Sequence, residues 1–169
     1  MSSPHVQLAK EVLEGYVRDG ETPEPSFALP KELTDIKAGV FVSLKIKGEL
    51  RGCIGTISPV TGCVADEITQ NAVSAGTKDP RFPPVRPEEL ESLEYSVDVL
   101  AAPEPCEKKD LDVIKYGVIV TRGYRRGLLL PNLEGVEDAE RQVSIALSKA
   151  GIGSGEPYAL ERFEVTRFT

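Results

Sequence analysis

Residues 40–57 read VFVSLKIKGELRGCIGTI and show a strand pattern, a turn and a second strand. Apolar side chains alternate with other side chains from Val40 to Ile46, which is the periodicity of a half-buried β-strand. The residues from Lys47 to Glu49 have turn composition, and those from Leu50 to Ile57 return as a second strand. The sequence therefore predicts a β-hairpin here, with the other elements packing around it.

Helices are expected on both sides of this hairpin in the chain. Apolar residues recur at helical spacing between Val6 and Gly20, where a glycine ends the pattern. Ser58 is a typical helix cap, and Pro59 suits a first helical position, so we expect a second helix from there to Gly76. A third helix is expected from Val136 to Ala150.

The remaining apolar runs predict further strands, over residues 95–100, 117–121, 127–130 and 161–168. A short helical turn is expected at 111–114, and the proline-rich segments 21–30 and 79–87 are expected to be irregular. Strands and helices do not alternate strictly, so we predict an α+β fold with a mostly antiparallel or mixed sheet and flanking helices. No internal repeat is visible in the sequence.

Composition limits the kinds of function. The chain has 169 residues, 20 basic against 27 acidic side chains and a formal charge of −7, which suits one domain, residues 1–169. Binding to a nucleic-acid backbone normally needs a basic patch, and the tightest basic cluster is only Arg122, Arg125 and Arg126. We therefore expect nucleic acid to be an unlikely partner.

The sequence gives no sign of a membrane or an oxidising compartment. No apolar run approaches the roughly 20 residues that span a bilayer, and residues 1–5 lack the features of a signal peptide. The three cysteines form no framework of paired spacing, so reduced thiols and a cytoplasmic location are expected. Their spacing also argues against a zinc site, and no cofactor is indicated.

The hexapeptide Leu50–Gly55 contains the first candidate for chemistry. Two glycines within one strand suggest close approach of a ligand or another backbone, or a bulge. In a regular strand Arg51 and Cys53 share one face, so the guanidinium would favour the reactive thiolate of a nucleophilic Cys53. The alternative is that Cys53 is a small buried apolar residue. A histidine base for Cys53 is also missing, because the only histidine is His5.

The loop Asp79-Pro80-Arg81-Phe82 is the second candidate. Its prolines restrict the backbone, so Asp79 and Arg81 could be placed at a site with little loss of entropy. Asp79 is then a candidate base and Arg81 a candidate ligand-binding residue, together with Arg51, Gly52 and Gly55. The alternative is a salt bridge within the loop, with Phe82 anchoring it.

Three other positions are ambiguous. The stretch from Tyr124 to Arg126 suits either an anion site or an exposed hairpin tip. Cys63 falls near the start of the expected second helix, where a thiolate is favoured, but its neighbours suit core packing. Cys106 is expected to be a partly exposed bystander.

These motifs resemble the AMMECR domain family. Leu50–Gly55 is similar to the family's signature hexapeptide, and residues 79–84 to its Asp-x-Arg-Phe-x-Pro loop. The strand ending at Pro131 and the helix end at Lys149-Ala150-Gly151 match two further landmarks, so the resemblance covers nearly the whole chain. Departures are Tyr116, where the family often has histidine, and the absence of tryptophan near the last helix and strand.

The resemblance implies a single α+β domain with a larger and a smaller lobe and the hexapeptide strand near a cleft. It implies a small-molecule site, for binding or modification, in a system with Memo-like dioxygenase-related and radical S-adenosylmethionine proteins. Two alternatives remain: a non-catalytic interaction module for those partners, and a role in transcription, replication, repair or translation. It fixes no reaction, so whether the protein is an enzyme stays open.

Overall fold

The structure is a computed structural model that describes residues 2–169. Two compact units are recognised in it: unit 1 runs up to Val99 and takes in Thr166–Thr169, and unit 2 is Leu100–Val165. No helix in the described part of the chain is both long enough and apolar enough to cross a lipid bilayer.

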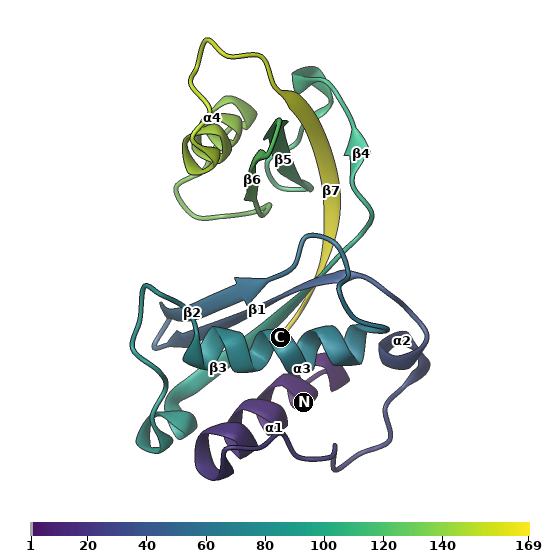
Figure 1. Ribbon diagram of the computed structural model, residues 1–169, viewed down its shortest axis with the longest axis vertical. Helices are drawn as coiled ribbons and strands as arrows, with labels where there is room; N and C mark the ends of the chain where they lie inside the picture. The colour runs from purple at the N-terminus through teal and green to yellow at the C-terminus, as the bar shows by residue number, and fades with distance from the viewer. Residues whose placement is uncertain (1) are drawn as a thin grey trace. The chain divides into compact units, whose positions relative to one another are not determined.

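Unit 1 is a small sheet with helices packed on one face (Figure 1). The sheet order is β2-β1-β3, and the end of β7 follows β3. Helix α3 packs on β1 and β2, and α1 packs on α3, so the core lies between these helices and the sheet. Its elements are α1 (Pro4–Asp19), α2 (Lys31–Thr34), β1 (Gly39–Ile46), β2 (Glu49–Gly55), α3 (Val64–Thr77), the 3-10 helix η1 (Pro87–Ser92) and β3 (Leu93–Leu100).

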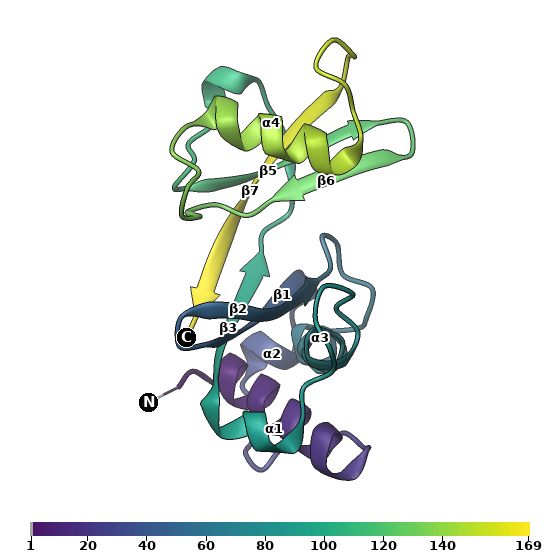
Figure 2. The same cartoon turned by 90° about the vertical axis from the view of Figure 1, so that its left-hand side faces the viewer.

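Unit 2 is built in a similar way around a second core. Its sheet order is β6-β5-β7, with the short β4 paired to β7, and α4 packs on β5 and β6 (Figure 2). The buried core includes Val118 and Val120 from β5 and Val143 from α4. Its elements are β4 (Glu104–Pro105), the 3-10 helix η2 (Lys108–Asp110), β5 (Tyr116–Arg122), β6 (Arg125–Leu129), α4 (Ala139–Ala150) and β7 (Ala159–Phe168).

The two units repeat one chain order, although no repeat was expected from the sequence. Each has an antiparallel hairpin, then a helix, then a third strand that lies beside the first strand of the hairpin. In each, the second hairpin strand carries a glycine with no room for a β-carbon. A β-carbon at Gly52 would clash with the carbonyl oxygen of Ala75 on α3, and one at Gly127 with that of Ala146 on α4.

A buried amide side chain repeats as well. Asn71 of α3 donates from Nδ2 to the carbonyl oxygen of Val40 on β1, at 2.9 Å. Gln142 of α4 donates from Nε2 to the carbonyl oxygen of Tyr116 on β5, at 2.9 Å. Asn71 lies four residues before Ala75, and Gln142 lies four residues before Ala146. Each amide therefore has the same position relative to the carbonyl group that faces the glycine.

The α+β prediction is confirmed, and the strand pairings resolved residue by residue are antiparallel. The helix starts were predicted too early. Helix α3 begins at Val64 instead of Ser58, because the Glu67 carboxylate accepts from the backbone N–H groups of Val60 and Thr61 and holds that segment as a loop.

Two other local predictions were wrong. Helix α4 begins at Ala139, three residues later than expected, because the Asp138 carboxylate caps it at the Arg141 N–H, 2.7 Å away. Residues 111–114 form no helix, since the Asp112 carboxylate accepts from the Ile114 N–H at 3.0 Å and stabilises a turn.

Candidate functional site

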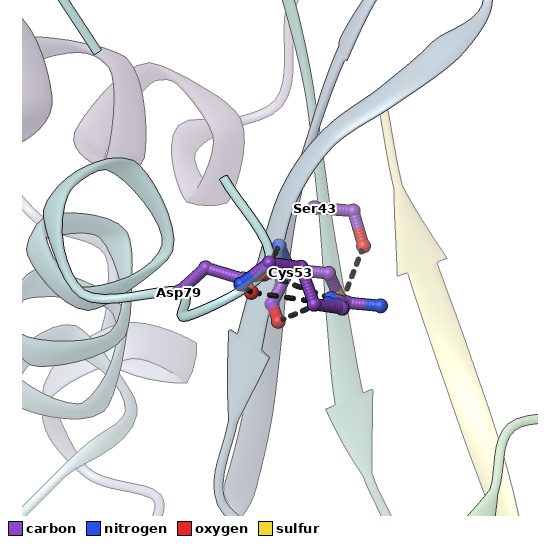
Figure 3. Close-up of polar contacts among 4 residues, drawn as sticks. Ser43, Cys53 and Asp79 are labelled. Carbon is purple, nitrogen blue, oxygen red and sulfur yellow. Dashed lines mark hydrogen bonds and ion pairs between the residues drawn. The ribbon is translucent and has the colours of Figure 1, made fainter. Parts of the chain in front are cut away.

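Cys53 and Ser43 form a polar pair on the sheet of unit 1. They are direct cross-strand partners on β2 and β1, and the Ser43 hydroxyl donates to Cys53 Sγ at 3.3 Å (Figure 3). Gly52 faces helix α3 and Ile54 packs on the core. Because strand side chains alternate, Cys53 projects from the face opposite the helices.

The environment of Cys53 keeps its thiol protonated. Burial is the main cause and raises the pKa of the thiol; the Ser43 hydrogen bond and the Arg81 charge lower it but do not offset burial. The thiolate is the nucleophilic form of cysteine. The geometry therefore does not favour an activated nucleophile, and Cys53 remains a partly exposed, neutral thiol.

The buried Asp79 connects the loop after α3 to strand β2 through hydrogen bonds. Its carboxylate accepts from the backbone N–H of Cys53 at 3.0 Å and from Arg81 Nε and Nη2 at 3.0 and 2.8 Å (Figure 3). The Arg81 hydrogen bonds are the main reason that the pKa of Asp79 lies far below its usual range. A carboxylate stabilised in this way is a weak base, so the contacts favour a positioning role over the base predicted from sequence.

Arg81 is held by Asp79 but remains available on its other side. Its side chain is 56% exposed, and its guanidinium binds the carboxylate side-on, through Nε and Nη2. Nη2 also approaches the carbonyl oxygen of Cys53, at 3.4 Å. The guanidinium also lies over the Phe82 ring, 5.5 Å from its centroid. No hydrogen bond of Nη1 is found within residues 2–169, so this nitrogen can donate to another group.

Arg51 lies apart from this group. The β1–β2 register shifts beside it, since Leu44 pairs with Gly52 and Lys45 with Leu50, so Arg51 is the extra residue of a bulge. Its guanidinium instead makes a bidentate ion pair with Glu89 of η1, at 2.9 and 3.1 Å. Arg51 is among neither the hydrogen-bond partners of Cys53 nor the causes of its pKa shift. A ligand-binding role for Arg51 stays a prediction.

Packing explains both glycines of the hexapeptide. Gly52 allows the carbonyl end of α3 to approach the strand, which is one of the alternatives expected from the sequence. Gly55 lies under the ring of Phe41, where a β-carbon would clash with the ring. Neither needs a ligand to account for it, and their predicted ligand-binding role stays untested.

Two site residues were missed in the sequence. Asp98 of β3 is buried, and its carboxylate accepts from Arg167 of β7 through Nε and Nη2, at 2.7 and 2.9 Å. A negative charge on the Cys53 side chain raises the pKa of Arg167, and it also raises the pKa of Arg81. Alternation in residues 95–100 could have placed Asp98 on the face away from the helices, but nothing in the sequence pairs it with Arg167.

Two surface hollows lie in unit 2, and none of Arg51, Cys53, Asp79 and Arg81 lines them. One groove of about 450 Å³ runs along α4, with Val143 and Leu147 among the apolar residues that line it. The other lies at the β5–β6 hairpin, where Tyr124 is 95% exposed and Arg125 is paired with Glu156. Residues 2–169 hold no cluster of three or more histidine, cysteine or acidic side chains suited to a metal ion.

Similar proteins come from bacteria and archaea. A Thermotoga maritima protein is 49% identical over 168 residues, covering 98% of this chain and 97% of its own length. A Clostridium acetobutylicum protein is 54% identical over 97% of this chain, which spans only 35% of that protein's length. An uncharacterized Pyrococcus horikoshii protein has a solved structure with a TM-score of 0.89 and 33% identity, covering 96% of this chain and 88% of that one.

The family comparison covers nearly the whole chain. The AMMECR1 family model matches residues 6–169, which include every element from β1 to β7 in both units. The chain therefore belongs to the AMMECR1 family.

Proposed function

We propose that the chain binds a small anionic molecule on the sheet face that carries Cys53. The observation that carries this proposal is the Arg81 guanidinium, which Asp79 fixes beside Cys53 with Nη1 unengaged and more than half of the side chain exposed. A guanidinium fixed on one side is preorganised to donate hydrogen bonds to a carboxylate or phosphate on the other.

Binding is favoured over covalent catalysis by Cys53. The pKa of the thiol is raised, and the two carboxylates that act on it, Asp98 and Asp79, are already engaged by Arg167 and Arg81. Cys53 would then contact the ligand as a neutral polar group. Whether the ligand is also modified depends on partners, for which the family resemblance suggests Memo-like and radical S-adenosylmethionine proteins.

The interaction-module alternative predicts a different use of the same strand. Nothing in the contacts of Ser43, Cys53 or Arg81 identifies a protein partner, so the small-molecule function is the one that the geometry supports better. The prediction that the whole chain acts as one domain is retained as part of this proposal.

Alkylation with two reagents of different charge tests the proposal. Iodoacetate and iodoacetamide both react when the thiolate attacks the methylene carbon, forming a C–S bond and releasing iodide while the thiol proton goes to solvent. Only iodoacetate carries a carboxylate, so a site that binds anions beside Cys53 should raise its rate selectively. The ratio of the two rates is measured at each cysteine by mass spectrometry.

The cysteines of the same chain are the controls. We expect the iodoacetate-to-iodoacetamide ratio at Cys53 to exceed the ratios at Cys63 and Cys106 by roughly tenfold, the effect of one charge-assisted hydrogen bond. Arg81→Gln should remove this excess, whereas Arg162→Gln should not. Equal ratios at the three cysteines would overturn the proposal.

A further inference from the structure

Arg167 and Asp98, on strands of the sheet, reproduce the side-chain pairing of Arg81 and Asp79 in the loop after α3. The buried Asp98 carboxylate holds Arg167 side-on through Nε and Nη2, as Asp79 holds Arg81. The Arg167 side chain is 38% exposed while Asp98 is 2% exposed. No hydrogen bond of its Nη1 is found among the described residues, so this nitrogen of a second fixed guanidinium can donate to another group.

The two guanidiniums make their contacts at different strands of the sheet. Arg81 reaches the carbonyl oxygen of Cys53 on β2, whereas Asp98, which anchors Arg167, is on β3. Strand β1, carrying Ser43, lies between β2 and β3. Neighbouring strands are about 4.8 Å apart, so the strands that carry Cys53 and Asp98 are separated by roughly 10 Å. We therefore expect each guanidinium to bind its own anionic group.

The charges on this surface are balanced without a ligand. Two arginines are matched by two buried carboxylates, and the Cys53 thiol is neutral. The carboxylates fix the arginines without covering them. Each guanidinium therefore keeps donors for an external oxygen, which is the preorganisation expected of a binding site.

We propose that the ligand carries two anionic groups, one bound by Arg81 and the other by Arg167, with its middle lying over Ser43 and Cys53. The ligand class is a dicarboxylic acid or a phosphorylated carboxylic acid. This inference rests on the proposed function, because it takes the anion site at Arg81 as its first half. Arg167 is then the residue that makes the site prefer ligands with two anionic groups over ligands with one.

Protection of Cys53 tests this inference in the whole chain. The probes are propionate and the dicarboxylates from malonate to adipate, each added at increasing concentration before iodoacetate. We expect one chain length of dicarboxylate to halve the alkylation rate at a concentration at least tenfold below that needed for propionate, because it gains a second charge-assisted contact. The chain length with the strongest effect then measures the separation of the two forks.

Variants separate this inference from the proposed function. Arg167→Gln alone leaves Asp98 buried without its partner, so the double variant Asp98→Asn with Arg167→Gln is the safer test, with its fold checked by urea unfolding. It should reduce the dicarboxylate to the level of propionate. Arg162→Gln, on the same strand but paired with Glu104, is the matched control and should keep the tenfold difference.

The outcomes are distinct. One outcome is that propionate and every dicarboxylate protect Cys53 equally, while the iodoacetate-to-iodoacetamide ratio is still highest at Cys53. A ligand with two anionic groups is then excluded, and the proposed anion site at Arg81 is retained. If iodoacetate shows no preference for Cys53, the proposed function itself fails. A dicarboxylate advantage that survives the double variant would assign the second contact to another residue.

Discussion

The two units have the same hairpin, helix and third strand, but only unit 1 has polar side chains at the centre of its hairpin. The residue after the repeated glycine is Cys53 in unit 1 and Leu128 in unit 2. Their cross-strand partners are Ser43 and Ile119, respectively. Leu128 and Ile119 are buried apolar residues, so this fold does not require a hydroxyl and a thiol there.

The comparison separates structural from functional features of the hexapeptide. Gly52 has a counterpart in Gly127 with the same packing reason, so this part of the motif belongs to the fold. Cys53 and Ser43 have no polar counterpart, and the fixed guanidinium of Arg81 lies beside them. The anion site that we propose therefore lies where unit 1 departs from unit 2.

The largest expected effect comes from filling the two glycine contacts. Gly52→Ala and Gly127→Ala each place a methyl group against a helix carbonyl oxygen, so each should lower the free energy of unfolding by about 3 kcal/mol. Urea unfolding measures the loss. The controls are Gly62→Ala and Gly155→Ala, where a β-carbon has no neighbour within 4 Å. If only one of the two glycines is sensitive, the structural equivalence of the units is broken.

The buried amides should differ in strength. Asn71 Nδ2 donates to the Val40 carbonyl and also approaches Thr56 Oγ1, so we expect Asn71→Leu to cost about 2 kcal/mol. Gln142 has one buried oxygen without a partner, and Gln142→Met removes that unpaired acceptor together with one hydrogen bond. Its cost should be below about 1 kcal/mol. Urea unfolding of both variants gives the comparison, and equal losses would contradict it.

Ser43 should change the titration of Cys53. The hydroxyl lowers the pKa of the thiol against the dominant effect of burial, so Ser43→Ala should move the pH profile of iodoacetamide alkylation to higher pH. At a fixed pH below the pKa, the variant should react more slowly because less thiolate is present. The measurement uses a chain with Cys63→Ser and Cys106→Ser. Ser96→Ala, on β3, is the control, and an unchanged profile for Ser43→Ala would remove the hydroxyl as a tuning group.

The sequence predicted the parts of this site that are local in the chain. Alternation placed the β1–β2 hairpin, and the Asp79–Arg81 loop stood out through its prolines. The role of Arg51 was harder to predict, because the bulge beside it breaks the alternation on which its shared face with Cys53 depended. Its partner Glu89 is 38 residues away, and no sequence pattern connects them.

The remaining features depend on distant pairing. Asp98 and Arg167 are 69 residues apart and meet on neighbouring strands, so periodicity could mark each strand but not the ion pair. The internal repeat was invisible for a related reason. Its shared constraints are one glycine and one amide contact, and the side chains at the other compared positions, such as Cys53 and Leu128, differ in chemistry.

The smallest expected effect concerns pH, and it again distinguishes the units. His5, the only histidine, is buried on α1 and stacks on Phe168 of β7 with ring centroids 3.7 Å apart. Its Nδ1 has no partner. Burial lowers the pKa of His5, and the charge of Glu32 offsets this only in part. Since the pKa in the folded state lies below the unfolded value of 6.5, the unfolded chain takes up the proton first.

The stability that neutral His5 provides is therefore fully present above pH 6.5 and declines as the pH falls below it. His5→Phe keeps an aromatic ring against Phe168 and removes the titration, so its free energy of unfolding should change less between pH 7 and 5 than that of the parent chain. Hydrogen exchange should show the difference in α1, while unit 2, which contains no histidine, stays unchanged. If the free energy of unfolding falls equally in the variant and in the parent chain, His5 is not the titrating group. If the loss of hydrogen-exchange protection is centred on unit 2, the pH effect does not belong to unit 1.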